Sequence, residues 1–219
     1  AAGSRIVNAN TFGASAHKLA GSAYTLEQVI TAGIENCKRA CAPYGALTAL
    51  DVGPLGELLE PSGTLAFEDA VAEYARIVKA GEAAGADLIF FETYTDLYEL
   101  KAALLAAKEN THLPILASMS FEAGGRTFTG CTVESFAATA RGLGADAVGI
   151  NCSLGPKEIF PMAKRLAEAV PGNFPVFVKP NAGLPRADGS GYDITPQLFA
   201  LQMKPYRELH LFAAGGCSG

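Results

Sequence analysis

Apolar and polar residues follow one another along the chain in a recurring order. A stretch with apolar residues at helical spacing is followed by a short apolar run, and the run ends in a polar residue. The apolar runs are bounded by turn residues, as in parallel strands that are buried on both faces. We predict strands over residues 5–10, 46–51, 87–92, 114–120, 146–152, 175–181 and 210–217.

The segments between these runs predict helices. They cover residues 25–41, 67–84, 96–108 and 133–143, and two more begin near Pro156 and Pro196. Thr64 and Thr132 are the expected N-caps of the second and fourth helix. Gly85 and Gly144 stand where a helix should end in a left-handed residue. This strand–helix repeat predicts an α/β fold, either a barrel or a doubly wound sheet, and we interpret residues 1–219 as one domain.

Composition excludes several classes of protein. The chain has 219 residues, a net charge of −5 and no run of five like charges, so it lacks the basic surface of a nucleic-acid or membrane-surface binder. No apolar run reaches the length of a membrane span, and residues 1–10 do not form a secretory signal, so we expect a cytoplasmic protein. Five cysteines in a chain of this length do not predict a disulfide framework.

Each predicted strand ends in a polar or ligand-type residue. The carboxyl ends of parallel strands meet at one edge of the fold, where functional groups gather in α/β proteins. Cys152 and Cys217 each stand at such an end, and two thiolates at one edge could hold Zn²⁺. The other candidate site residues at these ends are Asn10, Asp51, Glu92, Asn151 and Asn181.

Two segments carry a resemblance to a known family. Residues 151–156 read Asn-Cys-Ser-Leu-Gly-Pro, and residues 215–219 read Gly-Gly-Cys-Ser-Gly. They resemble the zinc-ligand segments of the homocysteine S-methyltransferase family, and residues 10–12, 51–54, 91–93 and 179–185 match further family segments in the same order. The resemblance implies a (β/α)₈ TIM barrel; with seven predicted strands, we expect the first β/α unit and the last helix to be missing.

The resemblance also implies a chemistry. Family members bind homocysteine through its thiol to Zn²⁺ and transfer a methyl group to that sulfur, which forms methionine. It implies Cys152 and Cys217 as metal ligands and Ser218 in the third-ligand position, where the family has cysteine. A hydroxyl is a harder and less acidic donor than a thiol, so Ser218 is a poor ligand for zinc.

The remaining roles follow from the same resemblance. Glu92 matches the carboxylate that holds the substrate ammonium, and Asn151 and Asn181 would bind the substrate or support the ligands, with Asp51 and Asn10 less well supported. The amino-acid sequence of residues 184–195 favours the branch of cobalamin-dependent methionine synthases. In that branch methylcobalamin on another domain donates the methyl group, and the partners are the cobalamin- and folate-binding domains.

Alternatives stay open at this point. The methyl donor could instead be betaine or S-methylmethionine, as in stand-alone members, or the chain could be a non-catalytic barrel remnant that serves as a binding or scaffold piece. A single cysteine at a strand end is usually a small buried hydrophobe. We interpret Cys37, Cys41 and Cys131 in that way, and His17, His112 and His210 as surface or satisfied core residues.

Overall fold

The computed structural model describes residues 3–219. The chain forms two compact units. Unit 1 contains the described residues up to Glu92, together with Tyr98–Leu116 and Leu143–Ala145. Unit 2 contains Thr93–Leu97, Ala117–Gly142 and Asp146–Gly219.

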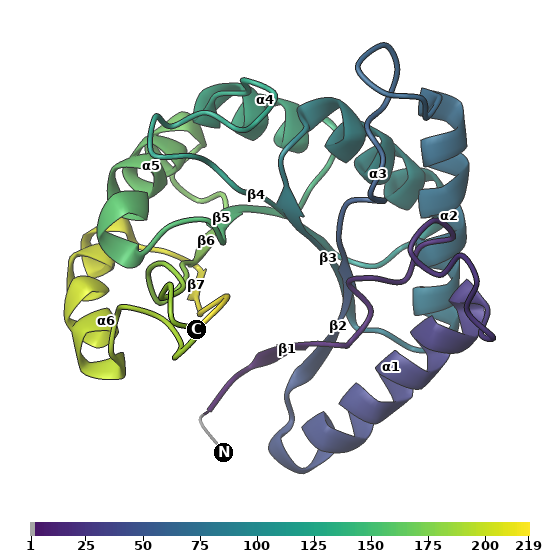
Figure 1. Ribbon diagram of the computed structural model, residues 1–219, viewed down its shortest axis with the longest axis horizontal. Coiled ribbons are helices and arrows are strands. Elements are labelled where there is room, and N and C mark those ends of the chain that lie inside the picture. The colour runs from purple at the N-terminus through teal and green to yellow at the C-terminus, as the bar shows by residue number, and fades with distance from the viewer. Residues whose placement is uncertain (1–2) are drawn as a thin grey trace. The chain divides into compact units, whose positions relative to one another are not determined.

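Unit 1 alternates strands with helices. Its elements are β1 (Ile6–Asn8), α1 (Leu26–Cys41), the 3₁₀ helix η1 (Ala42–Tyr44), β2 (Leu47–Val52), α2 (Phe67–Ala83), β3 (Leu88–Tyr94) up to Glu92, and α3 (Leu97–Asn110) from Tyr98. Strand β1 pairs with β2, and β2 pairs with β3, both in parallel. Figure 1 shows α1 and α2 beside the strands that they connect.

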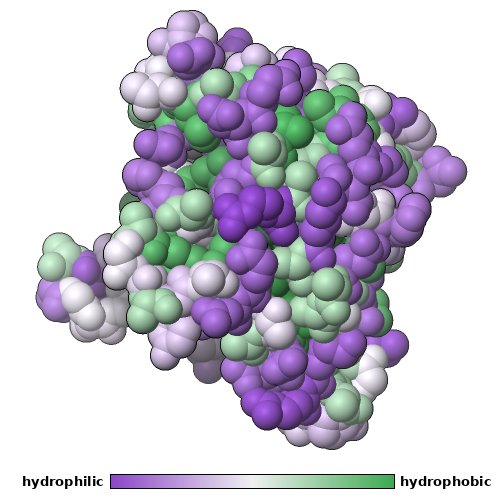
Figure 2. All heavy atoms as spheres, turned by 90° about the vertical axis from the view of Figure 1, so that its right-hand side faces the viewer, coloured by the Kyte–Doolittle hydropathy of each residue, from purple (hydrophilic) through white to green (hydrophobic). Residues whose placement is uncertain are grey.

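The helices of unit 1 bury their apolar sides against these strands. Ile30 and Ile34 on α1 are fully buried, and the Tyr74 ring on α2 stands edge-on to Phe91 of β3 at 6.2 Å between centroids. Thr25 and Gln28 form a capping box at the start of α1. The view in Figure 2, onto the side that lies on the right of Figure 1, shows mostly hydrophilic residues with hydrophobic ones between them. This is the pattern of amphipathic helices that cover a buried sheet.

Unit 2 repeats the same alternation. Its elements are β4 (Ile115–Met119) from Ala117, α4 (Val133–Gly142), β5 (Ala147–Asn151), α5 (Pro156–Ala169), β6 (Val176–Lys179), α6 (Pro196–Gln202), the 3₁₀ helix η2 (Lys204–Leu209) and β7 (Ala213–Ala214). Strand β5 pairs with β6 and β6 with β7, again in parallel. Helix α4 packs against α5, and the Phe136 ring of α4 lies 6.2 Å from Phe121 in the core.

Most predicted elements are confirmed, with shifted bounds. The α/β class and parallel strands are confirmed, as are Thr132 as an N-cap and the left-handed Gly85 and Gly144. The N-cap prediction for Thr64 is wrong, because α2 begins after Ala66, whose side chain has no group to cap it. The last strand is much shorter than predicted.

That shortening has a local cause. Strand β7 covers only Ala213–Ala214, since η2 and the left-handed His210 precede it and Gly215 and Gly216 follow it. The barrel closure and the missing first and last elements stay predictions. Within residues 3–219, no helix has the length and apolarity needed to cross a membrane.

Candidate functional site

The two cysteines of the predicted site follow β5 and β7, the strands on either side of β6 in unit 2. Cys152 comes directly after β5, and its N–H donates to the Lys179 carbonyl at 3.0 Å. Cys217 follows β7, and its N–H donates to the Pro180 carbonyl at 2.9 Å. The two backbones are therefore tied to successive carbonyls at the end of β6, and both cysteines are half-buried and free of disulfides.

Asn151, the last residue of β5, has a completely buried side chain. Its Oδ1 accepts the Thr93 N–H at 2.9 Å and the Ser118 hydroxyl at 2.8 Å. Its Nδ2 donates to Thr93 Oγ1 at 2.7 Å and lies 3.8 Å from Cys217 Sγ, within the range of a hydrogen bond to sulfur. One amide thus connects the ends of three strands and the segment that carries Cys217.

The backbone around these residues adopts an uncommon conformation. Thr93, Cys152 and Ser153 have φ values of 66°, 63° and 65°, in the left-handed region that normally favours glycine. Such a conformation costs about 1–2 kcal/mol for a residue with a side chain. Strained residues persist where surrounding contacts fix them, and they cluster at functional sites.

Asn181 and Ser218 lie on two segments that bind each other. The Ser218 N–H donates to Asn181 Oδ1 at 3.0 Å, and the Ala182 N–H donates to the Ser218 carbonyl at 2.8 Å. Asn181 is almost completely buried, and Ser218 is half-buried. The segment after β6 and the segment after β7 are held side by side by these bonds.

The other three predicted site residues belong to unit 1. Asp51 near the end of β2 is buried, and its backbone N–H and carbonyl are both bonded to the hydroxyl of Thr11. Glu92 is 8% exposed on β3, and Asn10 is exposed beyond β1. The structure therefore brings together Asn151, Cys152, Asn181, Cys217 and Ser218 in unit 2, and it places Asn10, Asp51 and Glu92 in unit 1.

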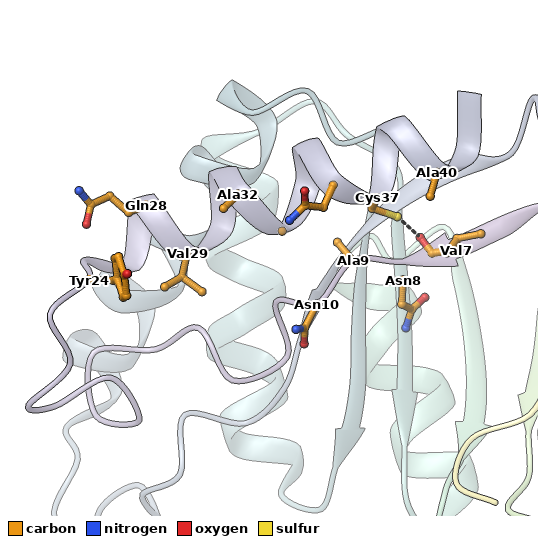
Figure 3. A pocket seen from close by; sticks show the side chains of 12 residues that line it. Val7, Asn8, Ala9, Asn10, Tyr24, Gln28, Val29, Ala32, Cys37 and Ala40 are labelled. Atoms are coloured by element: carbon orange, nitrogen blue, oxygen red, sulfur yellow. Dashed lines mark hydrogen bonds between the residues drawn. The ribbon is translucent and has the colours of Figure 1, made fainter. Parts of the chain in front are cut away.

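A groove in unit 1 was not foreseen from the sequence. It lies between β1 and α1, has a volume of about 540 Å³, and is lined by residues that include Asn10, Gln28 and Cys37 (Figure 3). Cys37 Sγ–H donates to the Val7 carbonyl at 3.6 Å, and its sulfur lies 3.8 Å from that of Cys41. Burial raises the pKa of the Cys37 thiol, which favours the expected packing role.

Comparison with models of known protein families identifies the family of this chain. The model of the family described as homocysteine S-methyltransferase matches residues 1–219. The chain belongs to the homocysteine S-methyltransferase family. The resemblance read from the motifs is therefore confirmed over the whole chain.

Individual homocysteine methyltransferases and methionine synthases are also similar. The chain is 34% identical over 143 residues to the methionine synthases of Mycobacterium tuberculosis and Mycobacterium leprae. These matches cover 62% of this chain and only 12% of either relative, so the chain spans a small part of the length of those proteins. Among solved structures, the homocysteine methyltransferase MmuM from Escherichia coli covers 98% of this chain, with TM-scores of 0.75 for its metallated form and 0.80 for its oxidized form. At 21% and 20% identity, with 75% of the MmuM chain covered in both cases, this likeness shows the shared fold.

The candidate metal site of this family member offers two thiols and one hydroxyl. Across the described part, residues 3–219, no three His, Cys, Asp or Glu side chains are grouped so that they could hold a metal ion. Cys152 and Cys217 supply soft thiols on the segments that follow β5 and β7, and Ser218 supplies only a hydroxyl. Cys131 lies outside these segments, and burial raises the pKa of its thiol to about 11, as expected for a packing cysteine.

The polar residues around Asn151 were missed by sequence reasoning. Thr93, Ser118 and Ser120 stand at strand ends, and each is bonded to Asn151. Their position at those ends was a usable signal. The left-handed conformation of Thr93 was not, because a β-branched residue disfavours it.

Proposed function

We propose that this chain is the homocysteine-binding module of a cobalamin-dependent methionine synthase, in which a methyl group is transferred to the thiol of homocysteine to form methionine. One observation carries the proposal. The cysteines of two family motifs, Cys152 and Cys217, are anchored to the successive carbonyls of Lys179 and Pro180. Two cysteines are thereby held on the segments that flank the end of β6, at the carboxyl ends of parallel strands, where α/β enzymes place their chemistry.

The donor set fits Zn²⁺ in part. Cys152 and Cys217 would hold the ion as thiolates, with Ser218 in the third-ligand position, and the thiol of homocysteine is the natural further sulfur donor. When bound, zinc acts as a Lewis acid that makes a coordinated thiol ionise near neutral pH. The weak hydroxyl donor at Ser218 reduces the affinity for the ion relative to a site with three thiolates.

The protein's own side chains would orient the amino acid. We assign the Glu92 carboxylate to the substrate ammonium, and Asn181 to the substrate carboxylate or to support of the segment that carries Ser218. The buried Asp51 and the exposed Asn10 are further candidates from unit 1. Orientation and exclusion of water are the contributions such residues make to the transfer.

The methyl donor belongs outside this chain. We assign it to methylcobalamin on another domain, with cobalamin- and folate-binding domains as partners and the cytoplasm as location. Similarity to methionine synthases over 12% of their length supports a module of a larger enzyme. Ser218 favours one competing function, a non-catalytic binding piece of the same fold, because it removes one of the family's sulfur ligands.

Zinc content and homocysteine binding test the proposal directly. We expect the chain to bind zinc weakly, homocysteine to strengthen zinc binding, and Ser218→Cys to raise the zinc affinity, because a thiolate replaces a hydroxyl as the donor. Cys152→Ser should abolish binding of the ion. Cys131→Ser is the matched control, because Cys131 lies outside the motifs, and it should leave zinc binding unchanged.

The same measurements separate the alternatives. If only the Ser218→Cys variant binds zinc and homocysteine, the chain is a disabled, non-catalytic member of the family. If no variant binds zinc, the assignment of Cys152 and Cys217 as ligands is wrong.

A further inference from the structure

We propose that Asn151 is a positioning residue that fixes Thr93 and Cys217, and that it makes no contact with the substrate. This inference deepens the proposed function and rests on it for the identity of the site. The reason is that every hydrogen-bonding position of its side-chain amide is already used inside the protein. An amide has two donor hydrogens on nitrogen and two acceptor lone pairs on oxygen.

The Asn151 side chain makes as many hydrogen bonds as its amide group can form. Oδ1 accepts from the Thr93 N–H and the Ser118 hydroxyl, and Nδ2 donates to Thr93 Oγ1 and toward Cys217 Sγ. The side chain is also 0% exposed. A substrate carboxylate would have to displace one of these partners, and the loss of a hydrogen bond inside the protein makes that unfavourable.

The orientation of the amide is fixed by chemistry. A backbone N–H can only donate, so the atom that faces the Thr93 N–H at 2.9 Å must be the oxygen. The nitrogen must then face Thr93 Oγ1 and Cys217 Sγ. Exchanging the two atoms would set two donors against each other.

The two bonds to Thr93 explain how this residue is held in its strained conformation. Its φ of 66° is unfavourable for a β-branched residue, and Asn151 binds both its N–H and its hydroxyl. The same amide approaches Cys217 Sγ at 3.8 Å. Asn151 therefore sets the backbone at the end of β3 and the orientation of a proposed ligand together.

The first arm of the test needs neither metal nor substrate. Amide hydrogen exchange of Thr93 is followed by NMR in the full chain, with the Val148 N–H on β5, which donates to the Pro175 carbonyl, as the reference. Asn151→Ala should speed exchange at Thr93 about tenfold or more relative to Val148, because its acceptor is lost. Asn151→Asp keeps an acceptor oxygen and should preserve protection. Ser120→Ala is the matched control, because the Ser120 hydroxyl donates to the backbone carbonyl of Asn151 and not to its side-chain amide.

The second arm separates positioning from substrate contact. Homocysteine affinity is measured for the zinc-supplied chain with Asn151→Ala, Thr93→Val and the double variant. If Asn151 acts through Thr93, each single variant weakens binding, and the double variant binds no more weakly than Asn151→Ala alone. Additive losses, with Asn151→Ala far more damaging than Thr93→Val, would overturn the proposal.

The two arms fail in different ways. If the parent chain binds no homocysteine, the proposed function is wrong, while the exchange of Thr93 still decides the role of Asn151. Unchanged exchange at Thr93 in Asn151→Ala overturns the positioning role, whatever the affinity for homocysteine.

Discussion

The residues that adopt positive φ are of different kinds in the two units. In unit 1 the left-handed positions are occupied by glycines such as Gly45, Gly56 and Gly85, for which this conformation carries no steric cost. Of the described residues, the four non-glycine ones with positive φ all belong to unit 2, and three of them, Thr93, Cys152 and Ser153, lie at the proposed site. Strain is thus confined to the unit that carries the cysteine motifs, which is where a functional constraint would place it.

The two units also use different kinds of buried polar side chain to bind the backbone and side chains around them. Unit 1 uses a carboxylate, Glu99 of α3, whose Oε1 accepts the Leu55 N–H at 2.7 Å and the Tyr74 hydroxyl at 2.9 Å. Unit 2 uses the neutral amide of Asn151, which both accepts and donates. A carboxylate can only accept when ionised, so it suits a structural anchor for donors, whereas an amide can also donate to a cysteine sulfur.

Replacing Glu99, the buried acceptor of unit 1, should change the free energy of unfolding most. Glu99→Leu would remove the carboxylate oxygen that accepts from the buried Leu55 N–H and the Tyr74 hydroxyl, and should lower the free energy of unfolding by about 3 kcal/mol. Glu99→Gln keeps one acceptor oxygen and should cost about 1 kcal/mol. Urea denaturation measures both variants. If Glu99→Leu and Glu99→Gln lowered the free energy of unfolding equally, the Glu99 oxygen would not be the acceptor on which this stability depends.

A left-handed glycine of unit 1 should resist substitution. Gly85 has a φ of 85° and lies just after α2, so Gly85→Ala places a Cβ in an unfavourable conformation. We expect a loss of about 1 kcal/mol in the free energy of unfolding. Gly13→Ala is the control, because its φ is not in the left-handed region and an added Cβ would meet nothing within 4 Å. An equal loss in both variants would contradict the explanation.

In unit 2, replacing a residue that has positive φ by glycine should raise the stability. Ser153→Gly relieves the strain of a φ of 65°, and the flexibility of glycine in the unfolded chain offsets part of the gain. The net expectation is a stabilisation of about 0.5 kcal/mol, measured as a rise in thermal midpoint. A loss of stability would mean that contacts of the serine outweigh its strain.

Loss of a surface ion pair in unit 2 should change the stability by a similarly small amount, with a defined pH dependence. Two bonds of 2.8 Å from Arg165 lower the pKa of Glu134 from 4.5 to about 2. Because the folded-state pKa is the lower one, the stabilisation is present above about pH 4.5 and is lost as the pH falls toward 2. Both side chains are about half exposed, so Glu134→Gln should cost only about 0.5 kcal/mol at pH 7.

Denaturation at several pH values between 7 and 3 checks this prediction. The difference between Glu134→Gln and the parent chain should shrink as the pH falls. A difference that stays constant would show that the pair does not act through the charge of Glu134.

Much of the fold was predictable from the sequence, and much of the site's geometry was not. Apolar runs and helical spacing located the seven strands and six α-helices of the described residues, because buried parallel strands must be apolar on both faces, but they did not predict the 3₁₀ helices η1 and η2. The short β7 and the cap of α2 were mispredicted, because both depend on tertiary contacts and local backbone geometry. The motifs located Cys152 and Cys217, but the four bonds of Asn151 join residues far apart in the sequence, and no local pattern predicts them.

We propose that Cys152 and Cys217 bind one zinc ion, to which homocysteine adds its sulfur. Zinc K-edge X-ray absorption of the zinc-loaded chain, before and after addition of homocysteine, tests it most directly. We expect two sulfur neighbours at about 2.3 Å before addition and one more afterwards. A first shell without sulfur, or a sulfur count that homocysteine leaves unchanged, would contradict the account.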